Sequence, residues 1–229
     1  MSQTELNSVM DRIGEKYNVE PMPLKIGERV LKVLQVKDLE EYLAELIEQK
    51  NVAPKDLPYW AKVWDSSLLL AYFLGKQPVV LGRRILEIGA GIGVIGVYAG
   101  LCGHSVTITD IDEDALLFAK ANALLNGVSH VEVKRLDWKN PDLAEPYDMI
   151  VGSEVVYDRE SYPALVRFLC KALAPNGMIF LAKNASLHTP AFFEKLAKYF
   201  EFKHTSKKVT ADGETQEIML YAIRPKQKQ

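Results

Sequence analysis

Four glycines lie in one twelve-residue stretch, ILEIGAGIGVIG, which runs from Ile85 to Gly96. The stretch can be read as Gly89-x-Gly91-x-Gly93 or as a Gly-x-Gly-x-x-Gly pattern that ends at Gly96. Between a strand and a helix, glycines let a ligand approach the backbone and take positive φ without strain. A tight turn without a ligand would also explain the first three, and close helix packing on the sheet explains Gly96 better. The stretch predicts a ligand-binding loop, with that turn as the alternative.

An acidic residue follows the glycines at a spacing that matters for nucleosides. Asp110 ends the apolar run HSVTITD, about 20 residues beyond the loop, where a carboxylate accepts hydrogen bonds from ribose hydroxyls. Asp110 could instead cap the helix that follows, although Asp112 is the better candidate for that cap. The loop and this acid together indicate a ribose, and they leave the rest of the ligand open.

Three features favour S-adenosyl-L-methionine over a dinucleotide. Glu87 lies inside the strand before the loop, where we expect its carboxylate to brace the loop or to meet an ammonium group of the ligand. Asp137 and Trp138 end a later strand and offer a carboxylate and an indole to the amino group and ring face of adenine. An ordinary turn residue and an exposed aromatic are the alternatives for these two. The third feature is a predicted antiparallel hairpin at the end of the chain.

The succession ILEIGAGIGVIG, TITD, LDW and SEVVYD resembles the class I, seven-β-strand S-adenosylmethionine-dependent methyltransferases. Within that class the chain is similar to the protein lysine methyltransferases with an acidic-x-x-Tyr motif after the fourth strand, here Glu154-Val155-Val156-Tyr157. PYWAKVWDSSLLLA also resembles this family, whose members place a tryptophan beside the cofactor ahead of the glycine loop. Trp64 is the match. Trp60 lies four residues earlier on the same expected helix face, and core packing is the alternative for both tryptophans.

The resemblance implies roles for the residues around this motif. Glu154 and Tyr157 become the expected catalytic residues, and Ser153 joins the expected cofactor site. Methyl transfer from a sulfonium is an in-line displacement that needs no metal. A lysine acceptor must first lose a proton, which costs roughly 4 to 5 kcal/mol at neutral pH. Because a carboxylate opposes that loss, we predict that Glu154 captures and orients the amine. A helix cap and a half-buried core tyrosine are the alternatives for the two residues.

The elements that must position these residues follow an alternating order. From residue 79, short β runs alternate with amphipathic helices, which is typical of a parallel sheet covered on both faces. Two strands joined at Ala211-Asp212-Gly213 must be antiparallel. We predict an α/β, Rossmann-like, doubly wound sheet of seven strands, mostly parallel, with a C-terminal antiparallel hairpin. The predicted strands are 83–90, 104–110, 131–137, 147–154, 177–184, 201–210 and 215–225.

Residues 1–56 are predicted to be an N-terminal extension packed on the methyltransferase domain, 57–229. We expect a short helix, a strand pair over 24–36 that turns at Gly27, and a helix from Asp38 to about residue 50. A buried helix should follow, capped by Asp65 or Ser66 and ending at Gly75.

Composition limits the partners. A net charge of −2 and a pI of about 6.1 argue against a nucleic-acid partner. No stretch approaches about 18 consecutive apolar residues, so we expect a cytoplasmic protein without a membrane span or signal peptide. Cys102 and Cys170 are expected to be reduced core residues, the four histidines form no metal pattern, and we expect a monomer.

Four functions remain open on the sequence. The first is N-methylation of a protein lysine, and the second is methylation of a small amine or aromatic nitrogen. The third, methylation of a nucleic acid or of glutamine, is disfavoured because residues 153–157 lack the proline-rich motif of such enzymes. The fourth is a module that binds S-adenosylmethionine and a protein without catalysis.

Overall fold

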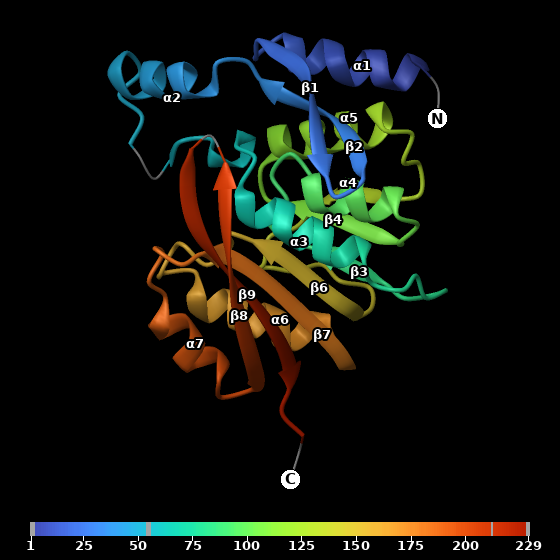
Figure 1. The fold of residues 1–229 in the computed structure, drawn as a ribbon, viewed down its shortest axis with the longest axis vertical. Coiled ribbons are helices and arrows are strands. Elements are labelled where there is room, and N and C mark those ends of the chain that lie inside the picture. The colour runs from blue at the N-terminus through green and yellow to red at the C-terminus, as the bar shows by residue number, and fades with distance from the viewer. Residues whose placement is uncertain (1–2, 54–55, 212, 228–229) are drawn as a thin grey trace.

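The computed structural model describes residues 3–53, 56–211 and 213–227, and it is built on a seven-stranded sheet (Figure 1). The strand order is β5-β4-β3-β6-β7-β9-β8. The first five of these run parallel, whereas β9 is antiparallel to both β7 and β8. The predicted fold class is confirmed. The strands are β3 (Ile85–Glu87), β4 (Val106–Asp110), β5 (Glu132–Arg135), β6 (Tyr147–Ser153), β7 (Leu173–Asn184), β8 (Phe200–Ala211) and β9 (Glu214–Pro225).

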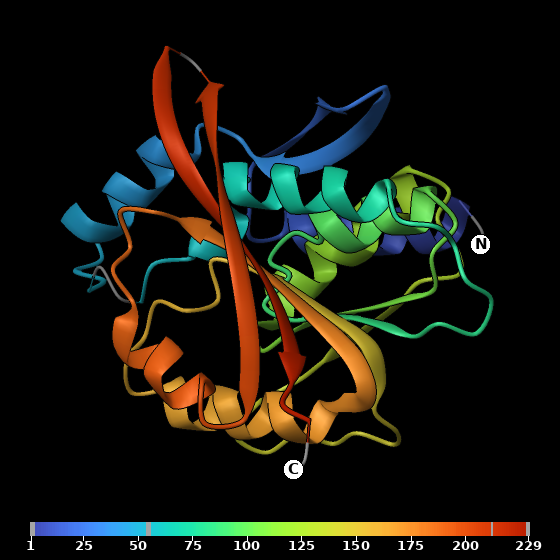
Figure 2. The ribbon, with the colours of Figure 1, turned by 60° about the horizontal axis from the view of Figure 1, so that its bottom comes forward.

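Helices cover both faces of this sheet (Figure 2). One face packs against α3 (Asp65–Gly75), α4 (Val94–Leu101) and α5 (Glu113–Leu125), and the other against α6 (Tyr162–Ala172) and α7 (Pro190–Leu196). Successive strand residues serve opposite faces: Ile85 belongs to the first core and Leu86 to the second. Both faces are therefore apolar, which is why the strands read as continuous apolar runs.

The strand order of the sheet reverses at β3. Both β4 and β6 pair with β3, so the chain winds outward in one direction through β4 and β5 and in the other through β6 and β7. In open α/β sheets, ligands bind at such a reversal, outside the carboxyl ends of the strands. The glycine loop after β3 and residues 153–157 after β6 both lie at this edge.

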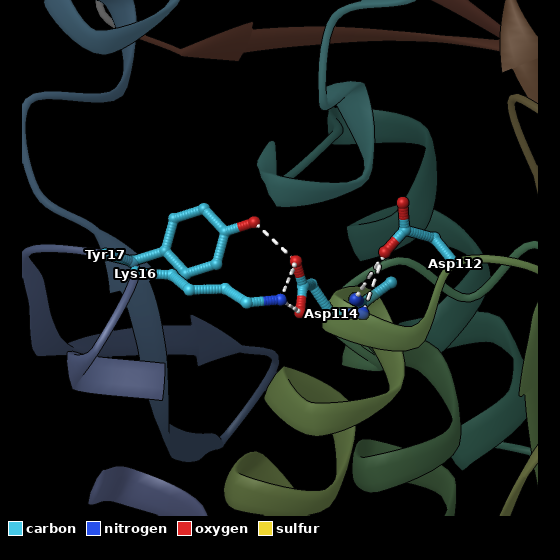
Figure 3. Close-up of polar contacts among 5 residues, drawn as sticks. Lys16, Tyr17, Asp112 and Asp114 are labelled. Atoms are coloured by element: carbon cyan, nitrogen blue, oxygen red, sulfur yellow. Dashed lines mark hydrogen bonds and ion pairs between the residues drawn. The ribbon is translucent and has the colours of Figure 1, made fainter. Parts of the chain in front are cut away.

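The N-terminal segment contains α1 (Gln3–Gly14), a separate two-stranded sheet of β1 (Val19–Ile26) and β2 (Arg29–Val36), and α2 (Leu39–Glu48). The hairpin and α1 lie against α5 (Figure 1). Lys16 and Tyr17 both bond to the carboxylate of Asp114 on α5, at 2.7 and 2.8 Å (Figure 3). The pair turns at Gly27 as predicted, but β1 begins five residues before the expected strand. The domain boundary at residues 56 and 57 stays a prediction.

Two local expectations are wrong, and a third includes a residue outside the described ranges. Helix α3 begins after Trp64 and receives no side-chain cap, so the prediction of Asp65 or Ser66 as the cap is wrong, although the helix does end at Gly75. The hydroxyl of Ser66 instead donates a hydrogen bond to Glu154. Cys170 is exposed on α6 and is not a core residue. The predicted turn at Ala211-Asp212-Gly213 includes Asp212, which lies outside the described residues.

Candidate functional site

Left-handed backbone shapes the glycine loop between β3 and α4. Gly89, Gly91 and Gly93 have φ of 56°, 53° and 81°. A side chain at any of them would also collide with the surrounding protein. An added Cβ would lie 2.8 Å from Val155 Cγ1 at Gly89, 2.6 Å from the carbonyl oxygen of Trp60 at Gly91, and 2.8 Å from Ala119 Cβ at Gly93. Conformation and close packing thus both require glycine here.

Gly96 lies where α4 packs on the sheet, as predicted. An added Cβ at Gly96 would lie 2.4 Å from Ile108 Cγ1, which confirms that Gly96 permits close approach of α4 to the sheet. The contact with Val155 also places the loop directly beside the segment that follows β6. The loop and the acidic-x-x-Tyr segment therefore lie side by side.

Glu87 lies beneath the loop and is 1% exposed. Its Oε2 accepts a hydrogen bond from the backbone N–H of Gly96 at 2.9 Å, so the carboxyl group braces the first turn of α4. Its Oε1 is buried and has no hydrogen-bond partner among the described residues. Burial raises the pKa of Glu87 to about 8, because little of the charge is compensated. Two roles are expected of Glu87, bracing the loop and contacting an ammonium group of the ligand. This geometry fits the first.

Asp110 ends β4 and is almost buried, at 9% exposed. Its Oδ2 accepts from Gly91 N at 2.8 Å and its Oδ1 accepts from Asp112 N at 3.0 Å. Burial raises the pKa of this carboxyl group. Asp112 is the cap of α5, because its Oδ1 accepts from the N–H groups of Asp114 and Ala115 (Figure 3). Asp110 therefore joins the glycine loop to the start of α5 and does not cap that helix.

Glu154, directly after β6, is fixed by two strong hydrogen bonds. Its Oε1 accepts from Ser66 Oγ on α3 at 2.7 Å and from Asn184 N at the end of β7 at 2.7 Å. Ser153 Oγ in turn donates to Ser66 Oγ at 2.8 Å. Glu154 has a left-handed φ of 54°, a conformation that non-glycine residues keep only when their surroundings enforce it. The alternative that Glu154 caps the next helix finds no support, because α6 begins only at Tyr162.

A buried lysine lies beside this carboxylate. Lys183 is 5% exposed, and its ammonium donates to the backbone carbonyls of Asn184 and Leu187. Burial lowers the pKa of Lys183, whereas the charge of Glu154 opposes that change. Burial likewise raises the pKa of Glu154, and the hydrogen bonds from Ser66 and Asn184 and the charge of Lys183 counteract it. The charge of Lys183 thus lessens the rise in the pKa of Glu154 but does not reverse it.

The remaining predicted residues line the same edge with varied exposure. Tyr157 is 67% exposed, so the alternative of a half-buried core tyrosine is wrong. Trp138 packs on the second core, with its ring edge 3.9 Å from where a Gly89 Cβ would lie. Asp137 uses Oδ1 to accept from Lys139 N, at 2.8 Å.

The two tryptophans before the loop have different environments. Trp60 packs against the rings of Tyr17 and Phe118, with centroids 5.7 and 5.2 Å away, so it is a core residue. Trp64 lies at the start of α3 between the ring of Tyr59 and the ammonium of Lys62. Trp60 therefore fits the core alternative, and Trp64 as a cofactor wall stays a prediction.

The groups that order Glu154 are not predicted as such by the sequence. Ser66 is predicted there only as a helix cap, and Lys183 and Asn184 only as the end of a strand. The single available signal was that residues 183 and 184 end a strand parallel to β6, so they had to lie near residue 154. Nothing in the local pattern distinguished Ser66 from Ser67.

Comparisons with known proteins identify the family and the fold. A family model described as lysine methyltransferase matches residues 58–199. Protein N-lysine methyltransferase METTL21A of Danio rerio is 42% identical over 123 residues, which are 50% of this chain and 56% of that protein. EEF1A lysine methyltransferase 3 of Xenopus tropicalis is 30% identical over 71% of this chain and 74% of its own length.

A solved structure shows the same fold. The N-methyltransferase NodS from Bradyrhizobium japonicum superposes with a TM-score of 0.58 at 17% identity, covering 83% of this chain and 100% of that one. None of the helices within the described ranges is long and apolar enough to cross a membrane. By the family match and the Xenopus relative, the chain belongs to the lysine methyltransferase family.

Proposed function

We propose that the protein is an S-adenosylmethionine-dependent methyltransferase that N-methylates a lysine of a protein substrate. The observation that carries the proposal is the ordered carboxylate of Glu154, held beside the glycine loop at the edge of the sheet where the strand order reverses. When bound, S-adenosylmethionine supplies a methyl group on a positively charged sulfur. The chain itself has to bind that compound, align the amine and exclude water.

The residues at this edge fit the cofactor. Each carboxylate oxygen of Asp110 holds one N–H group, and a carboxylate has about four acceptor positions, so two remain for ribose hydroxyls. Asp137 has an oxygen without a hydrogen bond in the described part of the chain, suited to an adenine amino group. The Trp138 ring and bare Gly89 form an adjacent apolar surface. Trp64 and Ser153 complete the proposed cofactor site, and Gly91 and Gly93 shape its loop.

Glu87 contributes to this site indirectly. Since its side chain is 1% exposed, we assign it to bracing the loop and not to touching a ligand ammonium. The loop is therefore held from below by Glu87 and from the side by Asp110.

Glu154 is proposed to bind and orient the acceptor amine. Its Oε1 is occupied by Ser66 and Asn184, whereas its Oε2 has no partner among the described residues and is not fully buried. A lysine ammonium donates three hydrogen bonds and can use that oxygen. The carboxylate favours the ammonium form and is therefore not the base that removes the proton of the amine. Water is proposed to accept that proton before methyl transfer. Tyr157, three residues after Glu154 in the chain, is exposed and is proposed to shape the entry for the acceptor.

The acceptor is assigned on the names of the relatives, two of which are called lysine methyltransferases. A small amine or an aromatic nitrogen is the alternative acceptor, and binding without catalysis is the alternative function. We further propose a cytoplasmic monomer that acts on proteins and not on nucleic acids, in keeping with the net charge of −2.

A labelling experiment tests the function. The purified protein is incubated with S-adenosylmethionine labelled in its methyl group and with a lysate of cells that lack the protein. We expect a labelled protein band whose mark mass spectrometry assigns to a lysine, and no label with Glu154→Gln. Label only in small molecules would contradict the protein acceptor. Cofactor binding by calorimetry without any turnover would favour the non-catalytic alternative.

A further inference from the structure

Asn122, on the buried face of α5, connects the N-terminal hairpin to the glycine loop. Its Oδ1 accepts from the backbone N–H of Leu34 in β2 at 2.6 Å, and its Nδ2 donates to the carbonyl of Ile92 at 2.8 Å. Asn122 is 1% exposed. One amide group therefore joins three segments, namely β2, α5 and the loop, and water does not compete for either bond.

The orientation of this amide is determined by the hairpin. In an antiparallel strand pair, alternate residues direct their N–H and C=O groups away from the partner strand, and Leu34, like Lys32 two residues earlier, directs its N–H to α5. The Leu34 N–H is buried and requires an acceptor. Once Oδ1 serves that donor, the NH₂ group must point to Ile92.

Ile92 occupies a critical place in the loop. Its neighbours Gly91 and Gly93 both have left-handed φ, so the peptide groups around Ile92 decide the path of the loop. Its carbonyl is the acceptor for Asn122, while Asp110 holds the N–H of Gly91 on the other side. Loss of the Asn122 bond would leave a buried carbonyl without a partner and favour other loop conformations.

We infer that Asn122 is a positioning residue for the cofactor loop, through which docking of the N-terminal hairpin and binding of S-adenosylmethionine favour each other. The inference rests on the proposed function and assigns the extension a part in cofactor affinity. By linkage, the coupling has to be reciprocal: the docked hairpin strengthens cofactor binding, and bound cofactor stabilises the docked hairpin.

The helix supplies a matched control one turn away. Asn126 also holds β2, because its Oδ1 accepts from Lys32 N at 3.0 Å and its Nδ2 donates to Lys32 O at 2.8 Å. It makes no hydrogen bond to the loop in the described part of the chain. Asn122→Ala and Asn126→Ala thus both weaken hairpin docking, but only the first releases Ile92.

The first measurement is the Kd of S-adenosylhomocysteine, by calorimetry, at a temperature where all variants are folded. We expect Asn122→Ala to weaken binding about fivefold or more, and Asn126→Ala to leave it within about twofold of the wild type. Asn122→Leu, which retains the side-chain volume, should behave like Asn122→Ala. Equal binding by all variants would overturn the inference alone, as would equal weakening by Asn122→Ala and Asn126→Ala. Failure of the wild type to bind would overturn the proposed function as well.

The second measurement uses the wild type and so does not depend on how the variants fold. Hydrogen exchange of individual backbone amides is followed with and without saturating S-adenosylhomocysteine. We expect the compound to slow exchange at Leu34, whose N–H bonds to Asn122, by about fivefold or more, and to affect Lys32 less. Unchanged exchange at Leu34, or an equal effect at both amides, would contradict the coupling through Asn122.

Discussion

The carboxylate of Glu154 receives its hydrogen bonds from two elements distant in the sequence, α3 and the end of β7. Ser66 and Glu154 are 88 residues apart, and the serine hydroxyl reaches the same oxygen that the Asn184 N–H uses. Two donors hold one oxygen, while the other oxygen has no partner among the described residues and is not fully buried. Catalysis by orientation depends on such fixed geometry.

Ser66→Ala should therefore lower kcat by about tenfold, because hydrogen bonds to charged groups contribute about 1.5 to 3 kcal/mol. The KM for S-adenosylmethionine should change less than kcat, since Ser66 bonds directly to Glu154 and reaches the proposed cofactor site only through Ser153. The measurement is steady-state methylation of the labelled substrate. Ser67→Ala is the matched control on the same turn, because the one bond of Ser67 Oγ within the described ranges is to the carbonyl of Trp64. Equal losses of kcat in both variants would contradict the role of Ser66.

Glu87 makes the stability of the ligand-free protein depend on pH. Burial raises its pKa from 4.5 to about 8, so between these values the unfolded chain releases a proton that the folded protein keeps. Stability must then fall as the pH rises through this window. By pH 7 the loss attributable to Glu87 is on the order of 3 kcal/mol.

Glu87→Gln should make that decline shallower in chemical unfolding measured from pH 5 to 8. Glutamine can still accept from Gly96 N and does not ionise. Asp110 and Glu154, whose pKa values burial also raises, should retain part of the slope. Glu28→Gln on the surface turn of the hairpin is the control and should follow the wild type. An unchanged slope in Glu87→Gln would show that Glu87 ionises normally in the folded protein.

At the scale of elements, the unit formed by β3, the loop and α4 is constrained on every side. The sheet, α5, the 3₁₀ turn η2 (Tyr59–Ala61) and the segment after β6 all contact its glycines. A residue with a side chain would meet both backbone strain and overpacking. These two costs can be separated by comparing glycines that differ in their surroundings.

Gly91→Ala should lower the free energy of unfolding more than Gly82→Ala does. Both glycines have positive φ, 53° and 78°, which costs alanine about 1 to 2 kcal/mol. Only at Gly91 does an added Cβ meet backbone, 2.6 Å from the Trp60 carbonyl, whereas nothing lies within 4 Å at Gly82. Overpacking should add about 1 to 3 kcal/mol and abolish cofactor binding. The measurements are urea unfolding and calorimetry, and equal destabilisation of the two variants would refute the crowding argument.

At the scale of the whole molecule, the N-terminal extension is joined to the sheet domain by both ring packing and polar contacts. The ring of Tyr17 lies between those of Tyr42, Trp60 and Phe118, and its hydroxyl donates to Asp114 (Figure 3). Asp114 follows the cap of α5, close to Asp110. The extension thus contacts the domain next to the proposed cofactor site.

Tyr17→Phe should cost about 1.5 to 3 kcal/mol of stability, because the rings stay packed and only the hydrogen bond to a charged group is lost. Tyr42→Phe is the control, since the Tyr42 hydroxyl makes no hydrogen bond within the described ranges. Urea unfolding of both variants checks the difference. A Tyr42→Phe variant as unstable as Tyr17→Phe would show that the Asp114 contact contributes little.

The sequence by itself determined the order of the elements, the fold class and the positions of the loop glycines. These depend on local properties: apolar periodicity, turn residues and the freedom of glycine at positive φ. The placement of Asp110 and Glu154 at one edge also followed, because the carboxyl ends of parallel strands share an edge.

Only the tertiary structure decided which partners those residues have. The choice of Ser66 over Ser67 as donor to Glu154, the bracing of the loop by Asp110 and the bridge through Asn122 all join segments 19 to 88 residues apart. Such pairings depend on how helices pack on the sheet and which buried N–H groups remain unpaired. No local pattern in the sequence encodes that packing.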